Sequence, residues 1–270
     1  GQINVGTFRQ TGGSLAGTGT LNGLFLWDGG NWNNSSITVA ATTGILTLAN
    51  NADHDFNGGT IINQGTVNWH SGYIRGGSGA TFTNAAGATF NDYNVSSFTV
   101  HNPGWGGSFV FTNDGTYVRN AGGTTHFDVA FNNNGTVSLL QGDIQFRAGG
   151  TLTASGQISA ASGTNVYFTN GYNVNNGSSL TGAGTYRLTG GTLNLSGQVN
   201  VGTFRQSGGS LAGAGTLNGL FLWDGGNWNN SSITVAATTG ILTLANNADH
   251  DFNGGTIVNQ GTVNWHSGYI

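Results

Sequence analysis

The chain has 270 residues, of which 36% are hydrophobic and only 6% are charged. All six basic residues are arginine and all ten acidic residues are aspartate, so the formal net charge is −4. This charge balance excludes the basic surface that nucleic-acid binding requires. No apolar run approaches the ~20 residues of a membrane-spanning helix, so we expect no membrane insertion in this segment.

The composition favours strands over helices. The chain lacks lysine, glutamate and methionine, which are good helix formers, and has 50 glycines, which are poor ones. The single proline, Pro103, excludes collagen, and the hydrophobic content can supply a core, which argues against disorder. The absence of cysteine excludes disulfides and cysteine-based zinc sites. The composition therefore predicts an all-β chain with many tight turns.

A long internal repeat dominates the sequence. Residues 1–74 recur at 197–270, an offset of 196 positions (197 minus 1), and only four of the 74 positions differ. We therefore expect a first unit at 1–196 and the start of a second at 197–270, both within one continuous solenoid. Because the sequence stops inside the second copy, we expect the native chain to continue through further copies joined end to end.

Shorter motifs predict strands within each unit. Polarity alternates at 46–48, 66–69, 144–147 and 192–195, as in half-buried strands. At roughly 18–28 residues per coil, one 196-residue unit would hold about nine coils of a β-solenoid. A Gly-Thr-apolar tripeptide, which also favours a strand after a turn, begins at Gly19, Gly65, Gly115, Gly135, Gly150, Gly184 and Gly191.

A β-sandwich or barrel could share this composition, but three features favour the solenoid. Asn-Gly pairs such as Asn22-Gly23 and Asn134-Gly135 suit coils that turn several corners, although they also suit hairpins. Asparagine side chains can stack in ladders between coils. Equivalent positions of stacked coils lie about 4.8 Å apart, so columns of like charge would repel, and the chain carries few charges.

One segment resembles a known group of proteins. Residues 12–23 read GGSLAGTGTLNG and are followed by WDGGNW at 27–32, and the same style recurs at 208–228. This is similar to the repeats of large secreted bacterial β-helix proteins, the filamentous haemagglutinin-like adhesins and autotransporter passengers. The resemblance implies a right-handed parallel β-helix, an extracellular or cell-surface location and a stalk or adhesive role. It carries over no functional residue.

The most chemically suggestive cluster is Asp53-His54-Asp55, repeated as Asp249-His250-Asp251. Two carboxylates and an imidazole could bind a divalent cation. The alternative is a solvated turn, because aspartates flanked by asparagine and glycine are typical of turns. The calcium-binding nonapeptide is not matched, since Thr81 stands where its aspartate should be.

Aromatic residues suggest a second kind of site. Trp27, Trp69 and Tyr73, together with Trp32 and Trp105, could form a platform on which a sugar stacks, because tryptophan and tyrosine offer a flat apolar face and a polar group. The alternative is an aromatic stack inside the solenoid or at its corners.

Other functions have weaker support. Polysaccharide-degrading β-helices need clustered carboxylates, whereas Asp92, Asp114, Asp128 and Asp143 are isolated in sequence, so we predict that the chain is not an enzyme. No motif predicts a cofactor. Ice binding would need regular threonine arrays, and the Thr-x-Thr motifs lack a coil-like spacing.

The combined prediction is a structural β-solenoid segment of a long extracellular bacterial fibre, filament or adhesin stalk. Its expected partners are further copies of the repeat, neighbouring fibres or cell-surface glycans. The alternative function is a glycan-binding adhesin that uses the surface aromatics.

Overall fold

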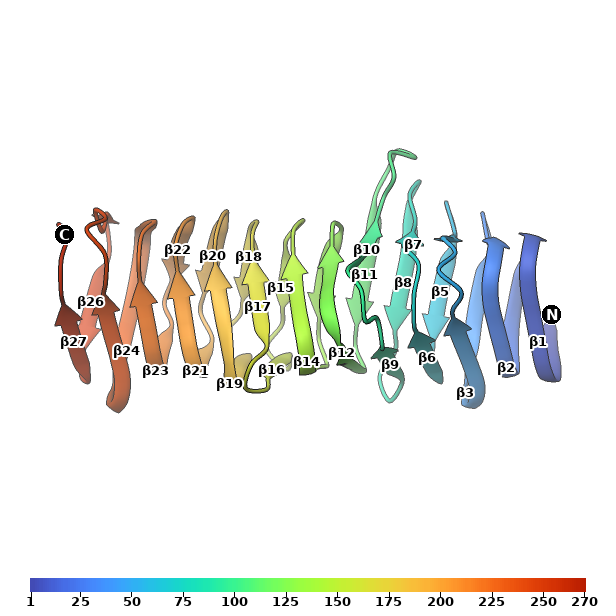
Figure 1. The fold of residues 1–270 in the computed structure, drawn as a ribbon, viewed down its shortest axis with the longest axis horizontal. Helices are drawn as coiled ribbons and strands as arrows, with labels where there is room; N and C mark the ends of the chain where they lie inside the picture. Colours follow the sequence, from blue (N-terminus) through green and yellow to red (C-terminus); the bar gives the residue numbers. More distant parts are fainter. The chain divides into compact units, whose positions relative to one another are not determined.

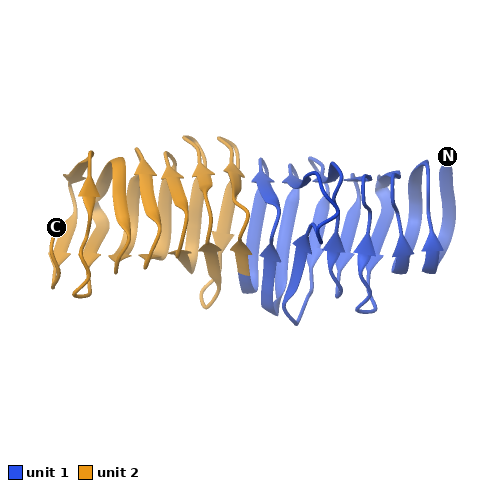
Figure 2. Ribbon diagram, turned by 90° about the horizontal axis from the view of Figure 1, so that it is seen from above, with its two compact units in different colours: residues 1–143 blue, residues 144–270 orange.

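A computed structural model describes all residues from Gly1 to Ile270 and contains strands but no helix. The chain divides into two compact units, Gly1–Asp143 and Ile144–Ile270, which Figure 2 separates by colour. The strands up to the division are β1 (Gln2–Ser14), β2 (Thr18–Asn31), β3 (Ser36–Leu48), β4 (His54–Asp55), β5 (Thr60–Asn63), β6 (Thr66–Trp69), β7 (Ile74–Arg75), β8 (Ala80–Asn84), β9 (Thr89–Asp92), β10 (Phe98–His101), β11 (Phe109–Asn113), β12 (Thr116–Phe127), β13 (Ala130–Asn133) and β14 (Thr136–Phe146), within which the division falls.

The remaining strands belong to unit 2. They are β15 (Gly150–Leu152), β16 (Gln157–Ala160), β17 (Asn165–Phe168), β18 (Tyr172–Val174), β19 (Ser179–Leu188), β20 (Thr192–Leu195), β21 (Gln198–Gln206), β22 (Ser210–Gly213), β23 (Thr216–Trp223), β24 (Asn227–Leu244), β25 (Phe252–Asn253), β26 (Thr256–Asn259) and β27 (Thr262–Trp265).

Unit 1 consists of stacked coils whose strands form three parallel ladders, which we call faces A, B and C (Figure 1). Face A contains the first parts of β1, β2 and β3, followed by β5, β8, β11 and β13. Face B contains the second parts of β1, β2 and β3, then β6, β9 and the first parts of β12 and β14. Face C contains the end of β2, then β4, β7, β10 and the end of β12.

Unit 2 also has three parallel ladders, and we name each by the duplicated residues that it contains. Its face A runs through β16, β19, β21, β23, β24 and β26, and its face B through β17, the second parts of β19, β21, β23 and β24, and β27. Its face C runs through β15, β18, β20, β22, the start of β24 and β25. Each unit is therefore a parallel β-solenoid, as the sequence predicted.

The number of coils also agrees with the prediction. The chain has about 13 turns in its 270 residues, which gives about nine turns per 196 residues. The coils differ in length, because Gln2 pairs with Thr20 in a short coil and Thr81 pairs with Val110 in a much longer one. The predicted strands 66–69 and 192–195 are β6 and β20, while residues 46–48 and 144–146 lie in β3 and β14.

Apolar side chains fill the interior of each coil because alternate residues of a strand point to the same side. In unit 1, Phe82, Phe111 and Phe131 stack along the axis, with ring centroids 4.8 and 5.4 Å apart. All three are fully buried. Burying one such ring contributes roughly 1.5–3 kcal/mol, so the stack is a principal source of cohesion between these coils.

A ladder of four asparagines runs beside this apolar stack. The Nδ2 groups of Asn63, Asn84 and Asn113 each donate to Oδ1 of the next asparagine, at 2.7 Å in every step, and the ladder ends at Asn133. All four side chains are fully buried. The predicted stacking of asparagine is thus present inside the coils, where it satisfies polar groups that would otherwise be costly to bury.

Glycine is required where the chain passes close to the preceding coil. A Cβ atom at Gly23 would lie 1.9 Å from the carbonyl oxygen of Val5, and one at the equivalent Gly219 would lie 2.1 Å from that of Val201. Both glycines have φ of +97°. These Asn-Gly pairs therefore form solenoid corners.

Candidate functional site

The structure separates the side chains of the Asp53-His54-Asp55 cluster. His54 points into unit 1 and is fully buried, with Nε2 2.9 Å from the carbonyl oxygen of Trp27 and Nδ1 3.3 Å from that of Tyr73. Burial lowers the pKa of the His54 imidazole, although the two carbonyls and the neighbouring aspartates oppose this shift. His54 is thus a core residue rather than a ligand facing solvent.

The two aspartates point outward and share one arginine. Arg75 Nε and Nη2 donate to the two oxygens of Asp55 at 2.6 and 2.8 Å, and Nη1 lies 2.7 Å from Asp53 Oδ2. The bidentate hydrogen bonding to Asp55 raises the pKa of Arg75. No group of three or more histidine, cysteine, aspartate or glutamate side chains is arranged to hold a metal ion.

These charges belong to a column on face C. Asp55 pairs in register with Arg75 and Arg75 with His101, on three successive coils. Asp128 comes next along the column, because its amide donates to the carbonyl of Val100, beside His101. The neighbouring charges Asp55 and Arg75 are thus of opposite sign, so they attract each other.

Aromatic rings flank this column. The centre of the Tyr73 ring lies 5.5 Å from those of both Phe98 and His101, and the Arg75 guanidinium lies 5.6 Å from the centre of the Trp105 ring. Burial and the nearby Arg75 charge both lower the pKa of His101. Tyr73 is 39% exposed, and Arg75, His101 and Trp105 are half-buried. The result is a row of flat groups in the order Tyr73, His101, Arg75 and Trp105.

Trp105 is carried by a loop at residues 102–108 that interrupts the regular coil. Figure 1 shows the connection between β10 and β11 extending beyond the turns beside it. Asn102 closes the loop, since its Oδ1 accepts from the amides of Gly104 and Trp105 and its Nδ2 donates to the carbonyls of Gly106 and Gly107. Ser78 donates from Oγ to the Trp105 carbonyl at 3.0 Å. The loop is therefore held by hydrogen bonds in one conformation.

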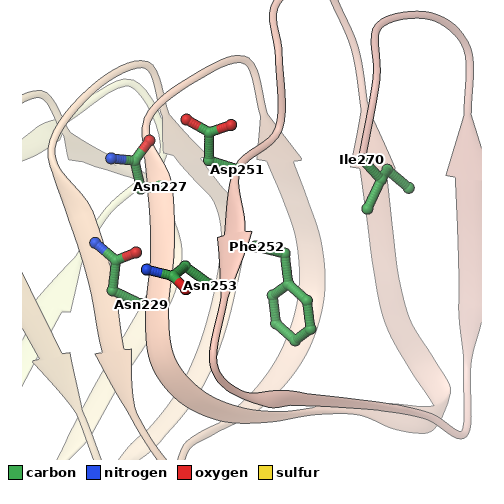
Figure 3. A pocket seen from close by; sticks show the side chains of 6 residues that line it. All are labelled: Asn227, Asn229, Asp251, Phe252, Asn253 and Ile270. Atoms are coloured by element: carbon green, nitrogen blue, oxygen red, sulfur yellow. The ribbon is translucent and has the colours of Figure 1, made fainter.

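In the second copy of the repeat, the same residues have a different environment. His250 is buried, with Nε2 2.8 Å from the Trp223 carbonyl, whereas Asp249 and Asp251 are exposed. Figure 3 shows that Asp251 lines an open pocket together with Asn227, Asn229, Phe252, Asn253 and Ile270.

The interpretation of Trp27 and Trp69 as sugar-stacking residues is wrong. Both side chains are fully buried. The Trp27 ring stacks on Trp32 at 3.9 Å, and the indole of Trp69 donates to the Gly72 carbonyl at 2.9 Å. Their burial supports the alternative, an aromatic stack inside the solenoid, and leaves Tyr73, which is exposed, and Trp105, which is half-buried, as the accessible members of the predicted platform.

Asp92, which is isolated in sequence, lies inside unit 1 in a polar network. Its oxygens accept hydrogen bonds from Arg119 Nη1 at 2.7 Å, from Tyr117 Oη at 2.6 Å, and from Thr125 and Asn94. Arg119 and Asp92 are both fully buried. Burial, followed by the adjacent Asp92 charge, raises the pKa of Tyr117 well above its usual range. This network has no access to solvent and is structural.

Threonines align on the outer side of face A, but not in an unbroken array. Thr18 and Thr20 pair with Ser36 and Thr38, and Thr60 pairs with Thr81. The two columns are interrupted by Ile62, Val110 and Ala130.

Sequence reasoning missed Arg75 and His101 as members of the site. Only the register between successive coils brings these two residues to the site, and this register depends on coil lengths that are irregular along the sequence. Trp105 was recognisable as unusual, because it follows the only proline and is surrounded by glycines.

No helix with the length and apolarity needed to cross a bilayer is present. Comparison with known proteins found no matching family model, curated protein or solved structure.

Proposed function

We propose that the chain is a structural segment of an extracellular bacterial fibre, filament or adhesin stalk, and that it extends by addition of 196-residue repeats. The observation that carries this proposal is that equivalent residues of the two sequence copies pair between coils in the same register. Gln2 pairs with Thr20 and Phe8 with Phe25 in the first copy, and the second copy pairs the equivalent residues in the same register. An added repeat therefore builds the same coils again.

The cohesion of the coils supports the same role. Each interior coil is hydrogen-bonded on both sides, with buried aromatic stacks and an asparagine ladder running between coils. In such an architecture stability rises as neighbouring coils are added, without a limit set by one closed core. The resemblance to secreted β-helix repeat proteins supports the extracellular location.

Electron microscopy of chains with one, two and three 196-residue repeats tests this role. With nine coils at about 4.8 Å each, particle length should grow by about 43 Å per repeat while the width stays constant. Compact particles whose diameters grow in all directions would contradict the proposal. Immunogold labelling of intact source cells tests the surface location separately.

A further inference from the structure

We propose that Tyr73, His101, Arg75 and Trp105 form a binding site for a neutral polysaccharide chain on face C of unit 1. This inference goes beyond the structural role. It also differs from the sugar platform predicted from the sequence, since the tryptophans at 27, 32 and 69 are buried, Tyr73 and Trp105 are retained, and Arg75 and His101 are added.

The first argument is the shape of the site. Tyr73 and Arg75 lie on one coil and His101 and Trp105 on the next. The ring centres of Tyr73 and His101 are 5.5 Å apart with the rings tilted by 56°, His101 is in register with Arg75, and Arg75 lies 5.6 Å from the centre of the Trp105 ring. All four residues are at least partly exposed. A small metabolite needs a concave pocket that covers most of its surface, whereas a row of flat groups fits successive sugar rings of an extended chain.

The second argument is charge. Asp53 and Asp55 carry two negative charges, and Arg75 carries one positive charge, which is already held by both aspartates. The local charge of about −1 disfavours anionic polymers. Arg75 also occupies one side of the Trp105 ring, where a cationic ligand would otherwise bind. A neutral ligand rich in hydroxyl groups is what remains.

The third argument is pre-organisation. Trp105 lies in the longest coil of unit 1, the one that separates Thr81 from its partner Val110, and the extra residues form the loop closed by Asn102. Hydrogen bonds from the preceding coil, from the amides of Ser78 and Gly79 to the carbonyls of Gly106 and Ser108 and from Ser78 Oγ to the carbonyl of Trp105, also hold the backbone of the loop. Rigid aromatic anchors lower the entropic cost of binding.

Native affinity electrophoresis of the full chain, in gels that contain a single polysaccharide, tests the proposal. The neutral probes are hydroxyethylcellulose, xyloglucan, galactomannan and dextran, and the anionic probe is alginate. At least one neutral probe should retard the protein, and Trp105→Ala should weaken that retardation at least tenfold. Trp105→Phe should keep part of it, and alginate should not retard the protein.

Trp265→Ala is the matched control, because Trp265 is an exposed tryptophan far along the chain on β27. It should bind like the wild type. Tyr73→Ala provides a second variant if Trp105→Ala does not fold, as judged by circular dichroism. Absence of retardation by all four neutral probes, or unchanged retardation of both Trp105→Ala and Tyr73→Ala, would overturn the proposal.

Discussion

Residues 1–74 and 197–270 have nearly the same sequence but different surroundings. Trp69 is fully buried, whereas its counterpart Trp265 is 60% exposed. The opposite holds near the start of the repeat, where Phe8 is 37% exposed and its counterpart Phe204 only 1%. In each case the buried member has paired coils on both sides. The core of a solenoid coil is therefore completed by its neighbours and not by its own sequence.

The largest expected effect is the difference in the free energy of unfolding between substitution of Trp69 and substitution of Trp265. Trp69→Ala should lower the free energy of unfolding by about 3–5 kcal/mol, because it leaves a cavity in a packed core. The same substitution at Trp265 should change it by less than about 0.5 kcal/mol. Urea titrations followed by circular dichroism provide the measurement. Equal losses would show that the coil's own sequence determines the contribution of this residue.

The first copy should also be sensitive to acid through His54. Burial places the folded-state pKa of this histidine below its ordinary value of 6.5. Its contribution to stability is therefore complete above pH 6.5 and declines as the pH falls through the folded-state pKa, since the unfolded chain then binds the proton more readily.

The pH dependence can be measured by thermal melts between pH 8 and pH 4. The wild type should lose stability on acidification, and His54→Gln should lose less over the same range. Parallel losses in the two proteins would refute the assignment to His54. Melting of the variant at pH 8 shows whether glutamine is accepted at this buried position.

The smallest expected effect concerns Arg75, which neutralises Asp53 and Asp55. Because the pair is partly exposed, Arg75→Gln should cost about 1 kcal/mol or less at low salt. The cost should shrink further in 0.5 M NaCl, since salt screens exposed charges. A salt-independent loss would indicate that the aliphatic part of the side chain, rather than its charge, stabilises the coil.

The fold was predictable because its signals are local. Alternation in 66–69 identifies β6, and the same alternation places Val67 and Trp69 on one side of the strand, which could have predicted that Trp69 is buried. The charged column was not predictable in this way. The step along the sequence from Asp55 to Arg75 is shorter than the step from Arg75 to His101, so their alignment depends on loop lengths that no periodicity reveals.

The buried asparagine ladder has a consequence for how coils find their correct alignment. The side-chain amides of Asn63, Asn84 and Asn113 each donate to the next asparagine in the same direction. These hydrogen bonds form only if every coil pairs with its neighbour in the correct register. A slip by one residue would turn the amide out of the interior and bring in a neighbour such as Ile62, leaving the adjoining amides without partners. The ladder therefore makes a register error of one residue energetically costly in these coils.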